Sequence, residues 1–109
     1  MSLKNFEMYQ LALKGVRLVR PLIAEIAKHD RDLATQLRKS VTSVPLNIAE
    51  GCESRKNNRL ARYADARGSA NEVVATLESS EALGYLKRER ILEPVDIFDH
   101  VGRGLFKMS

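Results

Sequence analysis

Basic residues gather between Ser54 and Arg67, where they could neutralise the phosphates of a nucleic acid. The segment holds five basic residues and one acidic residue, a surplus of four that equals the net charge of the whole chain. Binding by such a cluster would be salt-sensitive and independent of nucleotide sequence. The alternative is a solvated helix face with local ion pairs. The candidate nucleic-acid-binding residues are Arg55, Lys56, Arg59 and Arg62; the last two are three apart and so share a helix face.

A second group of polar residues surrounds Pro45 and continues beyond the basic segment. These side chains could line a ligand pocket. We favour a buried polar network that fixes helix register, because an amide and a carboxylate can satisfy backbone groups that a proline exposes, whereas an unpaired buried charge is costly. The structural polar motif on this interpretation comprises Asn47, Glu50, Gly51, Arg67 and Glu72. If Glu50 is buried and paired, Glu50→Ala should lower the stability by about 1–3 kcal/mol.

Catalytic or metal-binding chemistry finds little support in the sequence. The acid–histidine pairs, Glu25 with His29 and Asp96 with His100, lack the Glu-x-x-His spacing of di-iron bundles. The single cysteine, Cys52, has no histidine near it in sequence, and the chain contains no Ser-His-Asp order, phosphate loop or glycine-rich nucleotide fingerprint. We therefore expect a non-enzymatic protein without catalytic residues, a metal or a cofactor.

The elements that must position these residues are helices, because apolar residues recur at spacings of three and four along almost the whole chain. The first helix is expected from about Asn5 to Lys28, with a kink at Pro21. Its apolar seam and a second apolar stripe together cover more than half of the helix circumference. One face of a bundle explains only part of that arc, which indicates a second burial partner such as another subunit. The seam comprises Tyr9, Leu13, Val16, Val19, Ile23 and Ile26, and the stripe comprises Leu11, Leu18 and Leu22.

The second helix is expected to begin near Asp30 or Asp32, to kink at Pro45 and to stop at Gly51, which suits the left-handed C′ position. The third is expected from about Asn58 to Leu86, with Asn57 as its N-cap. Its seam is Tyr63, Ala66, Ala70, Val73 and Leu77, so Tyr63 is expected in the core rather than as a platform for base stacking. Gly68 adds to a run of small residues that favours a close helix approach. The fourth helix carries Ile91, Val95, Phe98, Gly102 and Leu105.

Four helices with short connections and no strand predict an all-α, antiparallel, up-down-up-down four-helix bundle, with residues 1–109 as a single domain. No apolar run approaches the roughly 20 residues that span a bilayer, and the first residues lack the apolar region of a signal peptide. A single cysteine suits a reducing compartment. We therefore expect a cytoplasmic protein with no membrane association, whose net charge of +4 leans mildly toward polyanions.

The string Ser43-Val44-Pro45-Leu46-Asn47-Ile48-Ala49-Glu50-Gly51 resembles the S-x-P-x-N-I-A-E-G motif of the bacterial "four helix bundle protein" family. That family was first described from intervening sequences in large-subunit ribosomal RNA genes. Further segments resemble it in order: Phe6 with Tyr9-Gln10-Leu11-Ala12, Gln36 to Ser40, Arg67-Gly68-Ser69 with Glu72, and Leu83 to Leu86. Two features depart from the family pattern: Leu46 replaces a small residue, and Asn57-Asn58-Arg59 is more polar and basic than usual.

The resemblance implies a left-handed bundle similar to the accessory variability determinant of diversity-generating retroelements, a basic homopentamer that binds nucleic acid beside a reverse transcriptase. It therefore implies a homo-oligomer, with a pentamer favoured, and no known catalysis. Our leading hypothesis is a homo-oligomeric bundle that binds RNA or DNA through its basic patch. The alternative is a protein-interaction scaffold whose charges only keep it in solution, and an enzyme ranks third.

Overall fold

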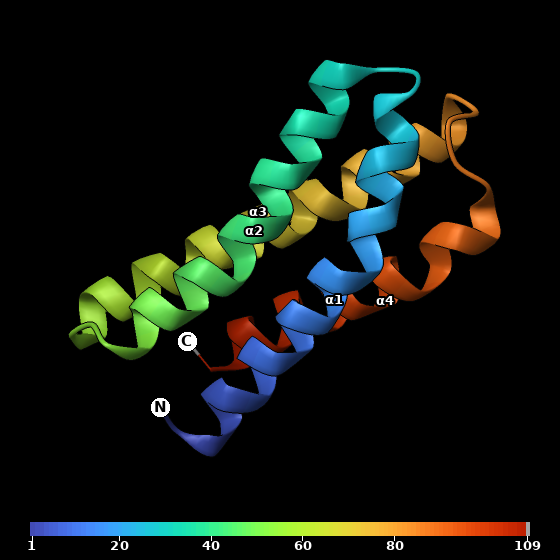
Figure 1. Cartoon of the computed structure of the whole chain (residues 1–109). Helices are drawn as coiled ribbons and strands as arrows, with labels where there is room; N and C mark the ends of the chain where they lie inside the picture. Colours follow the sequence, from blue (N-terminus) through green and yellow to red (C-terminus); the bar gives the residue numbers. More distant parts are fainter. Residues whose placement is uncertain (109) are drawn as a thin grey trace.

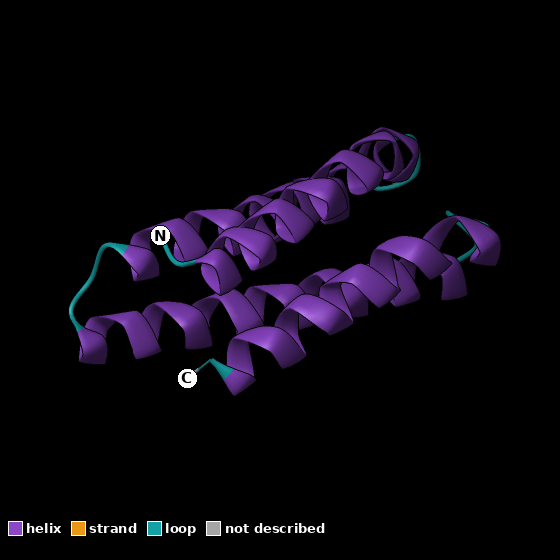
Figure 2. Cartoon of the chain, turned by 90° about the horizontal axis from the view of Figure 1, so that it is seen from below, coloured by secondary structure: helices purple, strands orange, loops and turns teal. Residues whose placement is uncertain are grey.

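The computed structural model describes residues 1–108, which form four α-helices and no strand. They are α1 (Leu3–Ala27), α2 (Arg31–Cys52), α3 (Lys56–Ala82) and α4 (Arg88–Lys107). Each helix packs against its neighbours in sequence, and α1 packs against α4 to close the bundle. Figure 2 shows two layers, α1 beside α2 and α3 beside α4. The predicted antiparallel four-helix bundle is confirmed.

The two termini lie at the same end of the bundle as the α2–α3 connection, and the other two connections lie at the opposite end (Figure 1). This arrangement follows from the up-down-up-down order with short loops. The part of the chain that the structure describes measures 42 × 23 × 18 Å along its principal axes. The basic segment between Ser54 and Arg67 therefore lies beside the chain termini. Within residues 1–108, no helix is both long enough and apolar enough to cross a membrane.

Side-chain hydrogen bonds cap the first turns of α1 and α2. The hydroxyl of Ser2 accepts the backbone N–H of Asn5 at 3.2 Å, and the carboxylate of Asp30 accepts that of Leu33 at 3.0 Å. These N-caps satisfy donors that the first turn leaves free. The predicted cap at Asn57 is wrong, because α3 begins at Lys56 and its N-cap is Arg55, whose side chain makes no capping bond.

A left-handed glycine ends α3 rather than α2. Gly84 has a φ of 81°, and the N–H groups of Gly84 and Tyr85 reach the carbonyls of Glu81 and Ser80 at 2.9 and 2.8 Å. This pair of bonds is the Schellman motif, in which glycine occupies C′ without a steric penalty. The prediction that α3 continues to Leu86 is therefore wrong by about one turn.

The prediction that α2 stops at Gly51 is also wrong, because Gly51 lies inside α2, which continues to Cys52. A Cβ atom at Gly51 would lie 2.6 Å from the ring of Tyr63. Its role is therefore a close approach of α2 to α3, and not a helix stop. Gly68, in contrast, does not mark the close helix approach that the run of small residues predicts. A Cβ there would meet no atom within 4 Å, and the residue is exposed.

Prolines lie inside α1, α2 and α4, at Pro21, Pro45 and Pro94. Figure 1 shows that α1 and α2 each change direction near the middle, as expected when a proline removes one backbone hydrogen bond and its ring crowds the preceding turn. The predicted kinks at Pro21 and Pro45 agree with these bends.

The core contains every residue of the predicted α3 seam, from Tyr63 to Leu77, at 1% exposure or less. In α1 the buried line is instead Met8, Ala12, Gly15, Val19, Leu22 and Ile26. Most of the predicted α1 seam flanks this line and is half-buried. The small residues turn inward because α4 approaches closely: a Cβ at Gly15 would lie 2.5 Å from the Phe98 ring. A pattern that weights large apolar residues cannot anticipate that choice.

Candidate functional site

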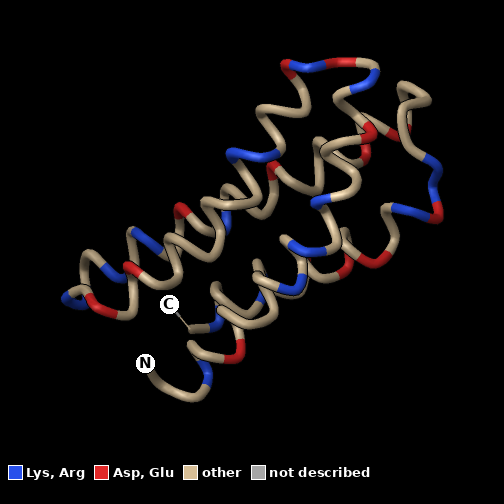
Figure 3. Tube along the Cα trace, in the orientation of Figure 1, with Lys and Arg blue, Asp and Glu red and all other residues tan. Residues whose placement is uncertain are grey.

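The candidate site is built around the start of α3. Arg55 and Lys56 are both exposed, and neither has an ion-pair partner among the described residues. The first turn of α3 contains no acidic residue and no capping side chain. Unsatisfied N–H groups give a helix N-terminus a partial positive charge, which adds to these two cations. Figure 3 shows basic residues along this connection, with acidic residues close to them.

Arg59 faces the first turn of α1. It lines a hollow of about 230 Å³ together with Lys4, Asn5 and Tyr63. Lys4 is therefore a basic residue of the same site, brought there because the chain's N-terminus lies beside the α2–α3 connection. Sequence spacing alone gave no reason to group Lys4 with Arg59, which lies 55 positions later in the chain.

Arg62 faces α2 instead. Its guanidinium Nη1 lies 3.1 Å from the Glu50 carboxylate Oε2, and the two side chains are 47% and 56% exposed. Arg62 lines a different hollow from Arg59, with Ser54 and Asp65. Arg59 and Arg62 therefore differ in surroundings although they lie one turn apart, and a carboxylate partly neutralises only Arg62. We call Lys4, Arg55, Lys56, Arg59 and Arg62 the basic end.

The five residues of the predicted structural polar motif do not form one buried network, so that interpretation is wrong for this chain. Asn47 donates to the Ser43 carbonyl at 2.9 Å within α2. Glu50 is exposed and pairs with Arg62, and Glu72 is exposed and accepts from the Gln36 amide at 3.1 Å. Helix register is fixed by smaller groups: Ser43 bonds the Ser69 hydroxyl across α2 and α3.

Arg67, the remaining charged residue of that motif, packs over the ring of Phe106 on α4. Its guanidinium carbon lies 5.1 Å from the ring centroid. This is the range of cation–π contacts. Phe106 is 68% exposed, and its neighbourhood is described below as a separate site.

Tyr63 is a core residue, as its spacing predicts, and it ties three helices together. The Tyr63 hydroxyl donates to Asn5 Oδ1 of α1 at 2.9 Å. Cys52 Sγ of α2 lies 3.7 Å from the Tyr63 hydroxyl oxygen. Burial, followed by the neighbouring Cys52 thiol, raises the pKa of Tyr63 to about 12. The phenol is therefore neutral at ordinary pH and can donate its proton to Asn5. No group of three or more His, Cys, Asp or Glu within residues 1–108 could hold a metal ion.

The sequence pattern of the 23S rRNA-intervening sequence protein family matches residues 4–107. The chain belongs to this family. The match covers the basic end and both helices that carry Arg67 and Phe106. The family resemblance drawn from the Ser43–Gly51 string is therefore confirmed.

A crystal structure at 1.70 Å resolution shares the family's fold: a protein of unknown function from the S23 ribosomal protein family of Bacteroides thetaiotaomicron VPI-5482. It superposes with a TM-score of 0.88 at 21% sequence identity, over 97% of each chain. No curated protein matches the sequence. These comparisons establish the family and the fold, and they leave the function to be argued from this chain's own surface.

Proposed function

We propose that this family member is a non-enzymatic, homo-oligomeric bundle that binds nucleic acid, RNA or DNA, through its basic end. The observation that carries the proposal is the group of cations without ion-pair partners in the described chain: Lys4, Arg55, Lys56 and Arg59. They come from two segments that the fold brings together beside the free N-terminus of α3. Cations that are not already paired can replace the counterions of a phosphate backbone.

The proposed assembly rests on α1. Tyr9 and Val16 pack against the core but remain half-buried, as does Leu13, and Phe6 is 49% exposed, so the helix keeps an apolar stripe that the core covers only in part. Residues at these spacings share one side of a helix. A second copy that covers this stripe would repeat the basic end in every subunit and strengthen binding to a long strand by avidity.

The first probe should be single-stranded RNA, because the family's own description refers to sequences that intervene in 23S rRNA. Affinity should fall with salt at a log–log slope of about −0.7 per phosphate contacted. Replacing Arg55 and Lys56 with alanine should weaken binding and make that slope shallower by about 1.4. Both residues are exposed, so the fold should be unaffected.

The matched control replaces Arg17 and Arg20, two exposed arginines of α1, with alanine. It removes the same charge from a different part of the bundle, so it should change the slope less than the Arg55/Lys56 variant does. The pair that spacing alone selects, Arg59 and Arg62, should also weaken binding when both become alanine. Equal slopes for wild type and the Arg55/Lys56 variant would place the binding surface elsewhere.

A second candidate function is a protein-interaction scaffold. The observation in its favour is the exposure of large apolar side chains that are not part of the basic end, Leu46 at 61%, Leu83 at 59% and Leu92 at 58%. Isolated exposed leucines are common on protein surfaces, so this support is weaker. Absence of RNA and DNA binding by the wild type at low salt would favour the scaffold.

A further inference from the structure

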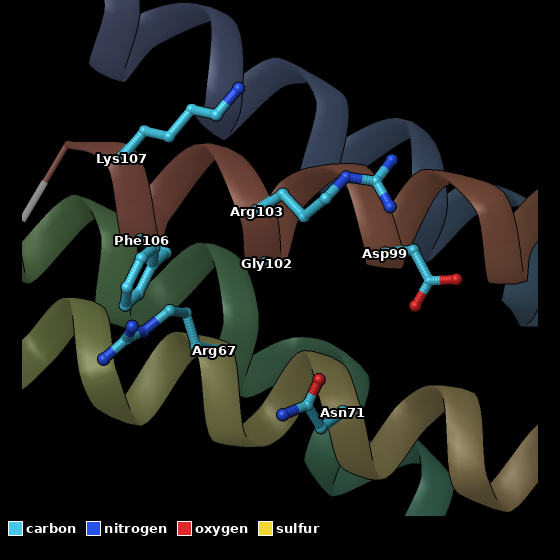
Figure 4. Close-up of a pocket in the computed structure, with 7 residues that line it drawn as sticks. All are labelled: Arg67, Asn71, Asp99, Gly102, Arg103, Phe106 and Lys107. Carbon is cyan, nitrogen blue, oxygen red and sulfur yellow. The ribbon is translucent and has the colours of Figure 1, made fainter.

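A groove between α3 and α4 forms a second site, separate from the basic end. Its volume is about 430 Å³, within the range of about 300–1,000 Å³ that small-molecule sites occupy. Figure 4 shows the side chains that line it, with Arg67 and Asn71 on α3 and Asp99 and Phe106 on α4. Gly102 leaves the α4 wall open, because a Cβ there would meet no atom within 4 Å.

The aromatic end of the groove has one occupied and one free ring face. Figure 4 shows Phe106 reaching from α4 toward the guanidinium of Arg67, which lies 5.1 Å from the ring centroid. The ring is nevertheless 68% exposed, so it can accept a second planar group. The Nε atom of Arg67 is buried and has no hydrogen-bond partner within the described residues. An unpaired charged donor in such a position is costly unless a ligand supplies an acceptor.

The charge of the groove favours an anion. Arg67, Arg103 and Lys107 contribute three cations against one acid, Asp99, and none of the four forms an ion pair in the described part of the chain. Arg103 and Lys107 are exposed and one helical turn apart; Figure 4 shows Arg103 extending along α4 away from Phe106, and Lys107 leaving α4 on the side opposite Arg67. Exposed long side chains can reorient over a phosphate at little cost. Asn71 and Asp99 add a donor and acceptors toward the end of the groove opposite the ring (Figure 4).

We propose that this groove binds a nucleotide, with the base stacked on Phe106 and the phosphate held by Arg67, Arg103 and Lys107. A planar ring system and an anionic group on one ligand match the free aromatic face and the surplus of cations. An acidic peptide would meet the charge but leave the Phe106 face unused. The nucleotide can come from a free pool or from a single strand, and both share this chemistry.

The chain contains no tryptophan, so a single introduced tryptophan can report on the groove by its fluorescence. Phe106→Trp places a single indole at the stacking position, and adenosine 5′-monophosphate should quench its fluorescence saturably. Inorganic phosphate at the same concentration should not. In a wild-type background, Phe106→Leu should lower the affinity measured by calorimetry about 5- to 150-fold, the range that base–aromatic stacking supports.

Two variants at glycine positions distinguish a blocked groove from an unfolded protein. Gly102→Leu fills the open groove and should abolish the quenching, whereas Gly68→Leu, which also enters open space on α3, should retain it. Circular dichroism should show both variants folded. A short oligoadenylate that binds more tightly than the mononucleotide identifies a strand as the source, and equal affinities identify a free nucleotide.

The proposal is overturned if the mononucleotide causes no saturable quenching at millimolar concentration, if phosphate alone quenches equally, or if Gly102→Leu binds as well as wild type. It is also overturned if the indole becomes shielded as protein concentration rises and the nucleotide no longer reaches it, because a second copy then covers the groove. The Arg55/Lys56 variant should keep mononucleotide binding while losing affinity for long strands. Failure of one site therefore does not imply failure of the other.

Discussion

At the scale of single residues, position 51 requires glycine because the ring of Tyr63 lies against it, and not because of its backbone conformation. A Cβ atom at position 51 would lie 2.6 and 2.9 Å from two ring carbons of Tyr63. The Tyr63 side chain is itself buried, at 1% exposure, so it cannot move aside easily. We expect Gly51→Ala to lower the free energy of unfolding by about 1–3 kcal/mol, the usual cost of overpacking a core. Urea denaturation measures this change.

Gly68→Ala is the matched control, since the same atom would enter open space in the middle of α3. Removing a glycine from a helix interior should raise stability by about 0.5–1 kcal/mol. Opposite signs for the two variants are expected, and a stabilising Gly51→Ala would contradict the close approach of α2 to α3. Sequence reasoning assigned these two glycines the reverse roles, because spacing shows where a glycine is and not what lies opposite it.

Glu50 provides a prediction that links stability to binding. Its ion pair with Arg62 is largely exposed, and such pairs contribute between about 0 and 1 kcal/mol. Glu50→Gln should therefore leave the unfolding midpoint nearly unchanged, while freeing Arg62 to contact phosphate and raising affinity for single-stranded RNA. Thermal melting and a binding titration at low salt measure the two effects. A loss of about 1–3 kcal/mol would instead support the buried network that the structure does not contain.

At the scale of the elements, Tyr63 joins α1, α2 and α3 through its ring and hydroxyl, and its ionisation should loosen them. Its pKa is raised from an ordinary value of 10.0 to about 12, chiefly by burial. Because the folded-state pKa is the higher one, the unfolded chain releases the phenolic proton first. Stability should therefore be unaffected below about pH 10 and fall between about pH 10 and 12, by up to about 2–3 kcal/mol.

Chemical denaturation across this alkaline range measures the fall, and Tyr63→Phe is its control. The phenylalanine variant should lose about 1 kcal/mol at neutral pH, where the bond to Asn5 is lost. It should then decline less than wild type above pH 10. Parallel alkaline curves for the two proteins would show that Tyr63 is not the residue that titrates.

The helices and their order could be predicted from apolar spacing, because spacing reports the period of burial. Where helices end depends on hydrogen bonds that spacing does not contain. Gly84 ends α3 through its left-handed conformation, whereas Gly51, equally plausible from its position after an apolar stripe, continues α2. The buried line of α1 differs from the predicted seam for a related reason: Gly15 faces inward because the ring of Phe98 on α4 occupies the space that a side chain there would need.

At the scale of the whole molecule, the candidate site was only partly predictable. The surplus of charge between Ser54 and Arg67 can be read from the sequence, and in the structure this segment begins at one end of the bundle. The contribution of Lys4 and the exposed ring of Phe106 over Arg67 both depend on segments distant in sequence. Each required the closed bundle, which brings both termini beside the start of α3.

The proposed assembly through α1 belongs to this scale and would set how strongly the basic end binds a long strand. Its apolar stripe of Phe6, Tyr9, Leu13 and Val16 is only partly covered by the chain's own helices. Burying such surface contributes about 25 cal/mol per Å², so a second copy is a favourable cover. Sedimentation equilibrium at tens of micromolar should show a homo-oligomer, with five subunits favoured.

Leu13→Glu should reduce the sedimenting mass to that of a monomer, because it places a charge where the partner subunit of the proposed assembly would pack. The matched control is Leu92→Glu, at a leucine of α4 that is 58% exposed and outside the stripe, and it should leave the assembly intact. Circular dichroism must show both variants helical, so that dissociation is not confused with unfolding. A wild-type monomer under these conditions would contradict the assembly, and binding to long RNA would then depend on the few phosphates that one basic end can contact, without the gain from avidity.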